Sequence, residues 1–303
     1  MVKLRRNINL EDKLDEFIEE CKKNREENKH GERDLLYLNT VKAFEGRGAY
    51  EIAVKCVNWM YSRRHQNLWI GITGSWDNLH QSVIEDVAQV TRYILAKGYG
   101  ISVGGSPGVP FVATDIVLRE GDPYRAKNQL IVSLPVPLEP FLDFYERASS
   151  HEVALLARSQ GKSVARQLEY LRDNFQFNIF DNTPIDVIRF LNPKNQDYRH
   201  PENQDYRKSA YYLRNSLEGY CCDGVIPFCV VADSEDVEES GVMNTRDHVS
   251  ALLKPVFTPF IYEISKSGEK VIRNYAEINI PGLQGDYPLP FYPNTFIDEE
   301  ITQ

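Results

Sequence analysis

Apolar residues recur along this chain first at helical spacing and then in alternating strand and helix patterns. Leu10, Leu14, Phe17 and Ile18 are spaced as on one side of a helix, and residues 49–64 repeat such a pattern. Residues 1–66 are therefore predicted to form a helical N-terminal prefix. This prefix either packs on the rest of the chain or offers a surface to a partner.

From Leu68 onward, short apolar runs alternate with amphipathic stretches. Strands are predicted at 68–72, 99–105, 129–136, 223–231 and 255–260, and helices at 82–98, 109–121, 208–220 and 243–254. Gly98 is a typical helix-ending residue. Strands that alternate with helices in this way indicate βαβ units with right-handed crossovers. The pattern predicts an α/β fold: a Rossmann-like, doubly wound, mostly parallel sheet.

Three regions result from this pattern. After the prefix, residues 67–262 are predicted to form one Rossmann-like domain, interrupted by an insertion at about 149–207. That insertion includes a helical pattern at 152–175, and a polar loop in which "NQDYR" occurs twice. Residues 263–303 are predicted to complete a hairpin (260–278, with its turn at Ser267-Gly268) and to end in a Pro-rich, aromatic tail.

Composition narrows the function classes. The formal net charge is -9, whereas nucleic-acid binders usually carry a basic face, although a local basic groove remains compatible with that total. The five cysteines form no C-x-x-C pair and no His/Cys pattern has metal-ligand spacing, so no metal site is predicted. No run approaches the roughly 18 apolar residues of a membrane span, and the start lacks a secretory signal. We therefore expect a cytoplasmic protein with reduced thiols and no membrane partner.

Glycine-containing loops after three of the predicted strands carry the main functional signal. They are Gly71–Ser75, Gly104–Pro110 and Glu239–Thr245. In a doubly wound sheet such loops line one crevice, where glycine and a helix N-terminus suit a phosphate. Each loop alone is as well explained by a tight turn. Neither G-x-G-x-x-G nor the P-loop pattern is present, which argues against an ordinary dinucleotide or ATPase site.

The order of several segments resembles a known superfamily. "GITGS", "GGSPGVPFVATDIVL", "LIVSLPVPLEPFLDFY", "YYLRNSLEGYCCDGVIPF" and "SGVMNTRDHVSALLKPVFTPF" resemble the SLOG superfamily. That group includes the DprA/Smf DNA-processing proteins and the Lonely Guy (LOG) phosphoribohydrolases, and the order is most similar to the DprA-like branch. The resemblance covers about residues 68–260. It implies a Rossmann-like fold that binds a nucleotide-like small molecule, and it suggests a homodimer paired through helices.

The resemblance also implies ligand-binding positions. They are Gly74 and Ser75 in the first loop, Gly104, Gly105 and Gly108 in the second, Arg214 and Asn215 before a strand, and Ser240, Gly241, Asn244 and Thr245 in the third. From the residues themselves, Asp115 could bind a ribose hydroxyl or be a solvated helix residue. Arg214 could contact a phosphate or solvent. Trp76 could stack on a base or cover the sheet edge.

The chain departs from the Lonely Guy pattern where that family carries its catalytic glutamate. His248 stands at that position, and Asp247 is a carboxylate one residue earlier. Cleavage of an N-glycosidic bond needs a carboxylate near the cationic sugar, so Asp247 is the candidate catalytic group. The alternative, which we prefer, is an acidic residue in the first turn of a helix, where the helix dipole favours it.

Three functions are compatible with the sequence. The first is a nucleotide-binding sensor or DprA-like module without cofactor. The second is an N-glycosidase, or phosphoribohydrolase, acting on nucleoside monophosphates. The third is a single-stranded DNA binder, for which Arg158, Lys162, Arg166, Arg172, Arg199 and Arg207 could supply a basic groove.

Overall fold

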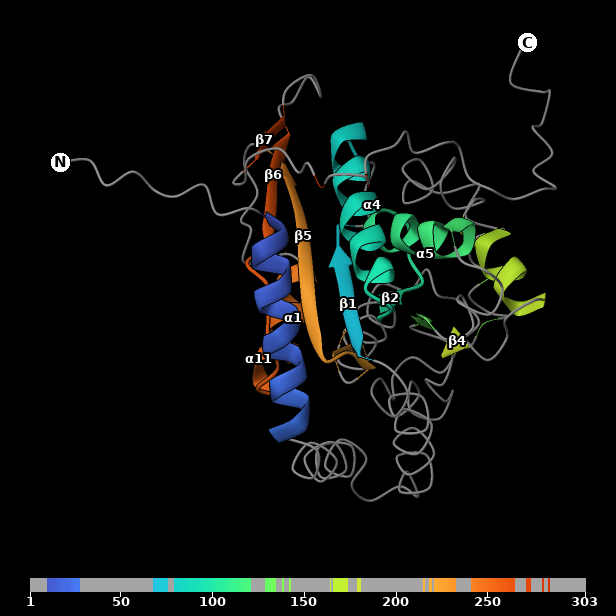
Figure 1. Ribbon diagram of the computed structural model, residues 1–303. Coiled ribbons are helices and arrows are strands. Elements are labelled where there is room, and N and C mark those ends of the chain that lie inside the picture. The colour runs from blue at the N-terminus through green and yellow to red at the C-terminus, as the bar shows by residue number, and fades with distance from the viewer. Residues whose placement is uncertain are drawn as a thin grey trace, which may run out of the picture.

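The computed structural model shows a Rossmann-like α/β fold built on one seven-stranded sheet (Figure 1). It describes residues 10–27, 68–75, 79–120, 129–134, 166–173, 221–232, 241–264 and 271–273, together with residues 138, 142, 164, 179–180, 215, 218–219, 280 and 283. The predicted helix at 49–64, the "NQDYR" pair and most of the tail lie outside these residues. The predicted helix at 208–220 is described at 215 and 218–219, which are helical.

The strands follow the order β4-β3-β2-β1-β5-β6-β7 across the sheet. Their bounds are β1 Trp69–Gly74, β2 Gly100–Gly104, β3 Leu130–Ser133, β4 Ile179–Phe180, β5 Gly224–Ala232, β6 Phe260–Ile264 and β7 Val271–Arg273. Every neighbouring pair is parallel except β6 and β7, which are antiparallel. The predicted doubly wound, mostly parallel sheet is confirmed.

Helices on both faces cover the sheet, and residues 166–173 are helical as well. The helices with described bounds are α1 (Leu10–Glu27), α4 (Gln81–Ala96), α5 (Val109–Glu120) and α11 (Gly241–Ala251). Side chains of α1, α4 and α5 share one hydrophobic core with the sheet, whereas those of α11 pack in separate clusters against β5. The helices thus lie on both faces, α11 opposite the other three (Figure 1). Gly98 follows α4 with φ +85°, so it ends that helix as predicted.

The strand predicted at 255–260 is wrong. Residues 255–259 contribute only an isolated bridge between Val225 and Val256, and the strand begins at Phe260. Pro255 and Pro259 have no N–H to donate to a ladder, which explains the late start. β6 instead pairs with β7 through Tyr262–Arg273 and Ile264–Val271, as the predicted hairpin requires. β6 therefore spans residue 262, which was predicted to be the last residue of the Rossmann-like domain.

Helix α1 packs into the main core rather than standing apart. Its buried side chains are Leu14, Phe17, Ile18 and Cys21, and the Phe17 ring meets Phe257 edge-on with centroids 5.5 Å apart. A Cβ on Gly224 would lie 2.4 Å from Cys21 Sγ, so glycine lets the helix approach β5. Of the two alternatives for the prefix, packing on the following domain is the one that α1 shows.

Asp223 joins α1 to the two central strands at their amino-terminal edge. Its Oδ2 accepts from the Trp69 backbone N–H at 2.8 Å and from Arg25 Nη1 at 3.3 Å. The backbone N–H of Asp223 donates to Trp69 O at 2.6 Å. Because this carboxylate is buried, these bonds compensate its desolvation and fix β5 beside β1.

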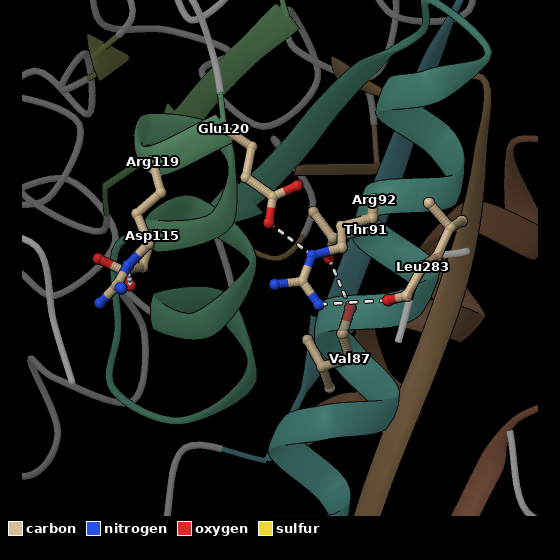
Figure 2. Close-up of polar contacts among 7 residues, drawn as sticks. All are labelled: Val87, Thr91, Arg92, Asp115, Arg119, Glu120 and Leu283. Atoms are coloured by element: carbon tan, nitrogen blue, oxygen red, sulfur yellow. Dashed lines mark hydrogen bonds and ion pairs between the residues drawn. The ribbon is translucent and has the colours of Figure 1, made fainter. Parts of the chain in front are cut away.

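Residues 280 and 283 lie against α4. Arg92 donates from Nε to Glu120 Oε1 at 2.5 Å and from Nη1 to Leu283 O at 3.3 Å, so it lies between α5 and that segment (Figure 2). Ile280 donates its N–H to Gln89 Oε1 at 3.1 Å and is itself buried. Residues 280 and 283 are thereby fixed to the third and fourth turns of α4.

Candidate functional site

The strand order reverses direction between β1 and β5. The chain builds outward from β1 through β2, β3 and β4, then returns to β5 on the other side of β1. Ligands of open α/β sheets bind at such a switch point, outside the carboxyl ends of the strands. The loops after β1, β2 and β5 leave the sheet at this edge, so the three glycine loops identified in the sequence converge there.

Ser75 extends the pairing of β1 with β5. Its backbone N–H donates to Phe228 O at 3.1 Å, its hydroxyl donates to Val230 O at 3.2 Å, and the hydroxyl accepts from Val230 N–H at 2.9 Å. These bonds draw the two strands together beyond the last regular pair, Gly74 and Phe228. Ser75 therefore bonds β1 to β5 beyond the end of the regular ladder.

Glycine at two of the predicted ligand positions serves helix and loop packing. A Cβ on Gly74 would lie 2.5 Å from Val109 Cβ, and one on Gly105 would lie 2.1 Å from Leu134 Cδ2. Real Cβ contacts are never this short, so only glycine allows α5 to begin against β1. This is a structural need for glycine, and it exists without a ligand.

The first turn of α5 offers few free donors. Val109 N–H donates to Ser75 O at 3.1 Å, and Pro110 has no N–H. Gly108 precedes the helix with φ +74°, which glycine adopts readily, and Gly104 is the last residue of β2. Of the first three helical residues, Val109 already uses its N–H on Ser75 and Pro110 has none, which leaves the N–H of Phe111 for a ligand. The second loop is thus a tight turn with little capacity to bind phosphate.

His80 caps the start of α4. Its Nδ1 accepts from the Ser82 backbone N–H at 3.2 Å, and its carbonyl accepts from Val83 N–H at 2.9 Å. The first turn of α4 contains no acidic residue. The first turn of α4 therefore has no carboxylate to compensate the helix dipole.

Helix α11 begins at Gly241, directly after the third glycine loop. Its first turn is also free of acidic residues, whereas α1 carries Glu11 and Asp12 in its first turn. Thr245 is buried in α11. Ser240 and the side chain of Asn244 lie outside the described part. The backbone at Gly241 is thus the first part of α11 that a ligand at the switch point would meet.

Asp247 does not lie in the first turn of its helix. Because α11 begins at Gly241, Asp247 falls in the second turn, and our preferred interpretation of it was wrong on this point. The helix starts earlier than the hydrophobic pattern indicated, since a glycine and a valine precede the first predicted residue. The Asp247 side chain is 64% exposed and pairs with Arg246 Nη2 at 2.8 Å. It is a solvated surface ion pair.

The remaining predicted residues lie in different surroundings. Asp115 is fully buried in α5 and pairs with Arg119 Nε at 2.5 Å, so it is not a solvated helix residue (Figure 2). Asn215 is buried and helical. Arg214 and Trp76 lie outside the described part. A buried, ion-paired Asp115 has no exposed carboxylate oxygen for a ribose, so its role in the structure is to hold Arg119.

One polar pair near the switch point carried no signal in the sequence. Tyr262 OH donates to Asp86 Oδ2 at 3.0 Å, and both residues are buried between α4 and β6. Tyr262 is the register partner of Val230, to which Ser75 is bonded. Asp86 sits among apolar residues of a helix pattern, where only the tertiary contact with Tyr262 distinguishes it from a surface carboxylate.

The four cysteines in the described residues are buried in the core. Within the described ranges Cys21, Cys221, Cys222 and Cys229 are buried free thiols, and no cluster of metal-ligating side chains occurs. Burial, followed by the charge of Asp223 and the neighbouring Cys222, raises the pKa of the Cys21 thiol far above its usual value. A thiol that resists ionisation is a poor nucleophile.

Comparison of the chain with protein-family models, curated proteins and solved structures gave no match. In the part of the chain that the structure describes, no helix combines the length and apolar character needed to cross a bilayer.

Proposed function

We propose that this protein binds a nucleotide or nucleotide-derived ligand at the carboxyl edge of β1 and β5, with the phosphate at the N-terminus of α11. The observation that carries the proposal is the strand-order reversal between β1 and β5, where α4 and α11 begin on opposite faces of the sheet. The resemblance of the loop sequences to the DprA-like branch of the SLOG group agrees with a ligand of this class.

The charge at the helix N-termini supports an anionic ligand. Acidic residues are the usual stabilisers of a first helical turn, and α1 follows that rule with two of them. Helices α4 and α11 have none. A carboxylate in the first turn of either helix would repel a phosphate, so the absence of one suits a site for an anion.

Binding rather than catalysis is the function that the described carboxylates favour. Asp247 is exposed and paired with Arg246, Asp115 is buried and paired with Arg119, and Asp86 is buried against Tyr262. Asp115 and Asp86 are buried, and Asp247 lies in the second turn of α11 as a partner of Arg246. A ligand held without a carboxylate at its glycosidic bond would leave the protein unchanged.

Calorimetric titration with a panel of nucleoside monophosphates tests the proposal. The decisive variant is Asn244→Asp, which adds a negative charge in the first turn of α11. We expect ligand affinity to fall about 3- to 10-fold while thermal stability stays equal or rises slightly, because the same charge favours the helix dipole.

Ser250→Asp is the matched control. It adds the same charge to an exposed position in the last turn of α11, away from the switch point, and should leave affinity unchanged. Equal losses in both variants would point to a general charge effect and contradict an α11 phosphate site. If the wild-type protein shows no heat of binding with any of the monophosphates, the proposed ligand class is refuted.

A further inference from the structure

The two faces of the central strands differ in chemistry. Towards α4 and α5, strands β1–β3 present only branched aliphatic side chains, namely Ile70, Ile72, Ile101, Val103, Leu130 and Val132. The opposite face of the same strands carries mostly glycine, serine and threonine. Parallel sheets are normally apolar on both faces, so the second face needs its own explanation.

Three buried polar atoms on that opposite face have no hydrogen-bond partner among the described residues. They are Trp69 Nε1, Ser102 Oγ and Ser133 Oγ. Trp69 is 3% exposed, and the two serines are fully buried. A buried donor or acceptor without a partner is destabilising, so three of them together would be a substantial penalty.

The strand register places these three groups on one diagonal line. Trp69 is the partner of Gly100, and Ser102 follows Gly100 by two residues on β2. Ser102 is the partner of Ile131, and Ser133 follows Ile131 by two residues on β3. Each step therefore crosses one strand and advances two residues, about 8 Å between Cβ atoms from the strand spacing and rise. The groups are too far apart to bond directly.

Neighbouring side chains pack against the backbone of this face. A Cβ on Gly100 would lie 2.2 Å from Trp69 Cε3, and one on Gly71 would lie 3.2 Å from Cys222 Sγ. The indole and the thiol thus fill the places that these two glycines leave. Because protein interiors are packed closely, a molecule of the size of water is the natural partner for isolated polar groups of this kind.

We propose that a chain of internal water molecules lies across this face, from Trp69 Nε1 past Ser102 Oγ to Ser133 Oγ. The indole N–H is a donor only, whereas each serine hydroxyl both donates and accepts, so waters between them can be bonded at each end. Buried waters characteristically satisfy polar groups of this kind. Ser133 is the last residue of β3 and its carbonyl accepts from Gly105 N–H, so the chain ends beside the glycine loop at the carboxyl edge.

Nuclear Overhauser spectroscopy tests the proposal on the folded wild-type protein. The chain has three tryptophans and so three indole N–H signals, and Trp69→Phe assigns the one that matters. We expect a cross-peak between the Trp69 indole proton and water, with the relative signs of laboratory- and rotating-frame spectra showing a bound water rather than exchange. The cross-peak should lose most of its intensity in Ser102→Ala. A Trp69 indole proton without a water cross-peak would overturn the proposal.

Thermal unfolding provides an independent test of the two serines. If waters bond the hydroxyls, Ser102→Ala and Ser133→Ala each lower the unfolding temperature by about 2–4 °C, the shift for a lost hydrogen bond in a protein of this size. Thr114→Val is the control, because Thr114 Oγ1 already donates to Pro110 O at 2.9 Å and its loss calibrates a satisfied hydroxyl. A rise in unfolding temperature in both serine variants would show hydroxyls without partners and would contradict the water chain.

Discussion

At the scale of single residues, Gly74 separates a structural from a ligand-binding need for glycine. Gly74→Ala places a Cβ 2.5 Å from Val109 Cβ, and we expect it to reduce the free energy of unfolding by about 1–3 kcal/mol through overpacking. Chemical denaturation of the single variant measures this. The double variant Gly74→Ala/Val109→Ala should recover part of the loss. A Gly74→Ala protein of unchanged stability that no longer binds nucleotide would assign the glycine to the ligand instead.

His248 makes stability depend on pH. Burial lowers its pKa below the usual 6.5, and Asp247 opposes that shift in part. The folded state therefore binds the proton less well than the unfolded chain does. Stability from this residue is complete above about pH 6.5 and is lost as the pH falls from there through the lower folded-state pKa.

Replacement of His248 by glutamine should flatten the stability profile between neutral and mildly acidic pH. Denaturant midpoints measured across that range for the wild-type protein and His248→Gln provide the comparison. Asp247→Asn should have the opposite sign, because it removes the charge that raises the pKa of His248 and so steepens the loss. Parallel profiles for His248→Gln and the wild-type protein would contradict this assignment.

Some residue roles could be predicted from the sequence, and others depended on contacts between residues that are distant in the sequence. Gly98 was predicted to end a helix and does so with positive φ, because that requirement is local. The close packing that requires glycine at position 74 could not be predicted, since Val109 is 35 residues away and only the fold brings it near. In the sequence Asp86 is indistinguishable from any polar position of an amphipathic helix, because its hydrogen-bond partner, Tyr262, is 176 residues away.

At the scale of elements, the same division holds. Strands β1, β2 and β5 and helices α4 and α5 were predicted within a few residues, because apolar runs and helical spacing are strong local signals. The two-residue strand β4 was not predicted, since so short a strand has no period and exists only through its pairing with β3. The separate strand predicted from "PVFTPF" forms only an isolated bridge, because its two prolines have no N–H to extend a ladder.

Helix α1 is expected to behave as part of the domain core. Phe17→Ala should reduce the free energy of unfolding by about 3–5 kcal/mol, because it opens a cavity against Phe257 and Gly224. The neighbouring Glu16→Ala changes an exposed position of the same helix and should stay within about 0.5 kcal/mol of the wild-type value. Urea denaturation of both variants measures the difference. Similar stabilities for the two would show that α1 is not integral to the core.

At the scale of the whole molecule, the fold depends on residues that are distant in sequence. The switch point itself joins β1 to β5, whose first residues are more than 150 positions apart, and Ser75 is bonded across that interval to Val230. Sequence order alone predicted that three glycine loops would meet. It could not show that Ser75 would bond β1 to β5, or that the first N–H of α5 would be used to bond Ser75.

Arg92 links three parts of the chain through one side chain, and its geometry predicts that lysine cannot replace it. The guanidinium reaches Glu120 with Nε and Leu283 O with Nη1, two directions that its planar fork serves at once (Figure 2). A lysine ammonium keeps the charge, but it is a compact point charge and does not span both partners. Arg92→Lys should therefore lower the free energy of unfolding by about 1 kcal/mol, as expected for one lost hydrogen bond.

Arg172→Lys is the control, since Arg172 pairs with its exposed neighbour Asp173 and such surface pairs contribute little. Hydrogen exchange at the Ile280 amide gives the local readout, because the bond from that amide to Gln89 depends on the C-terminal segment staying on α4. Faster exchange at Ile280 in Arg92→Lys, with unchanged exchange in Arg172→Lys, is the expected result. Unchanged exchange in both would show that Ile280 and its buried side chain hold the segment without Arg92.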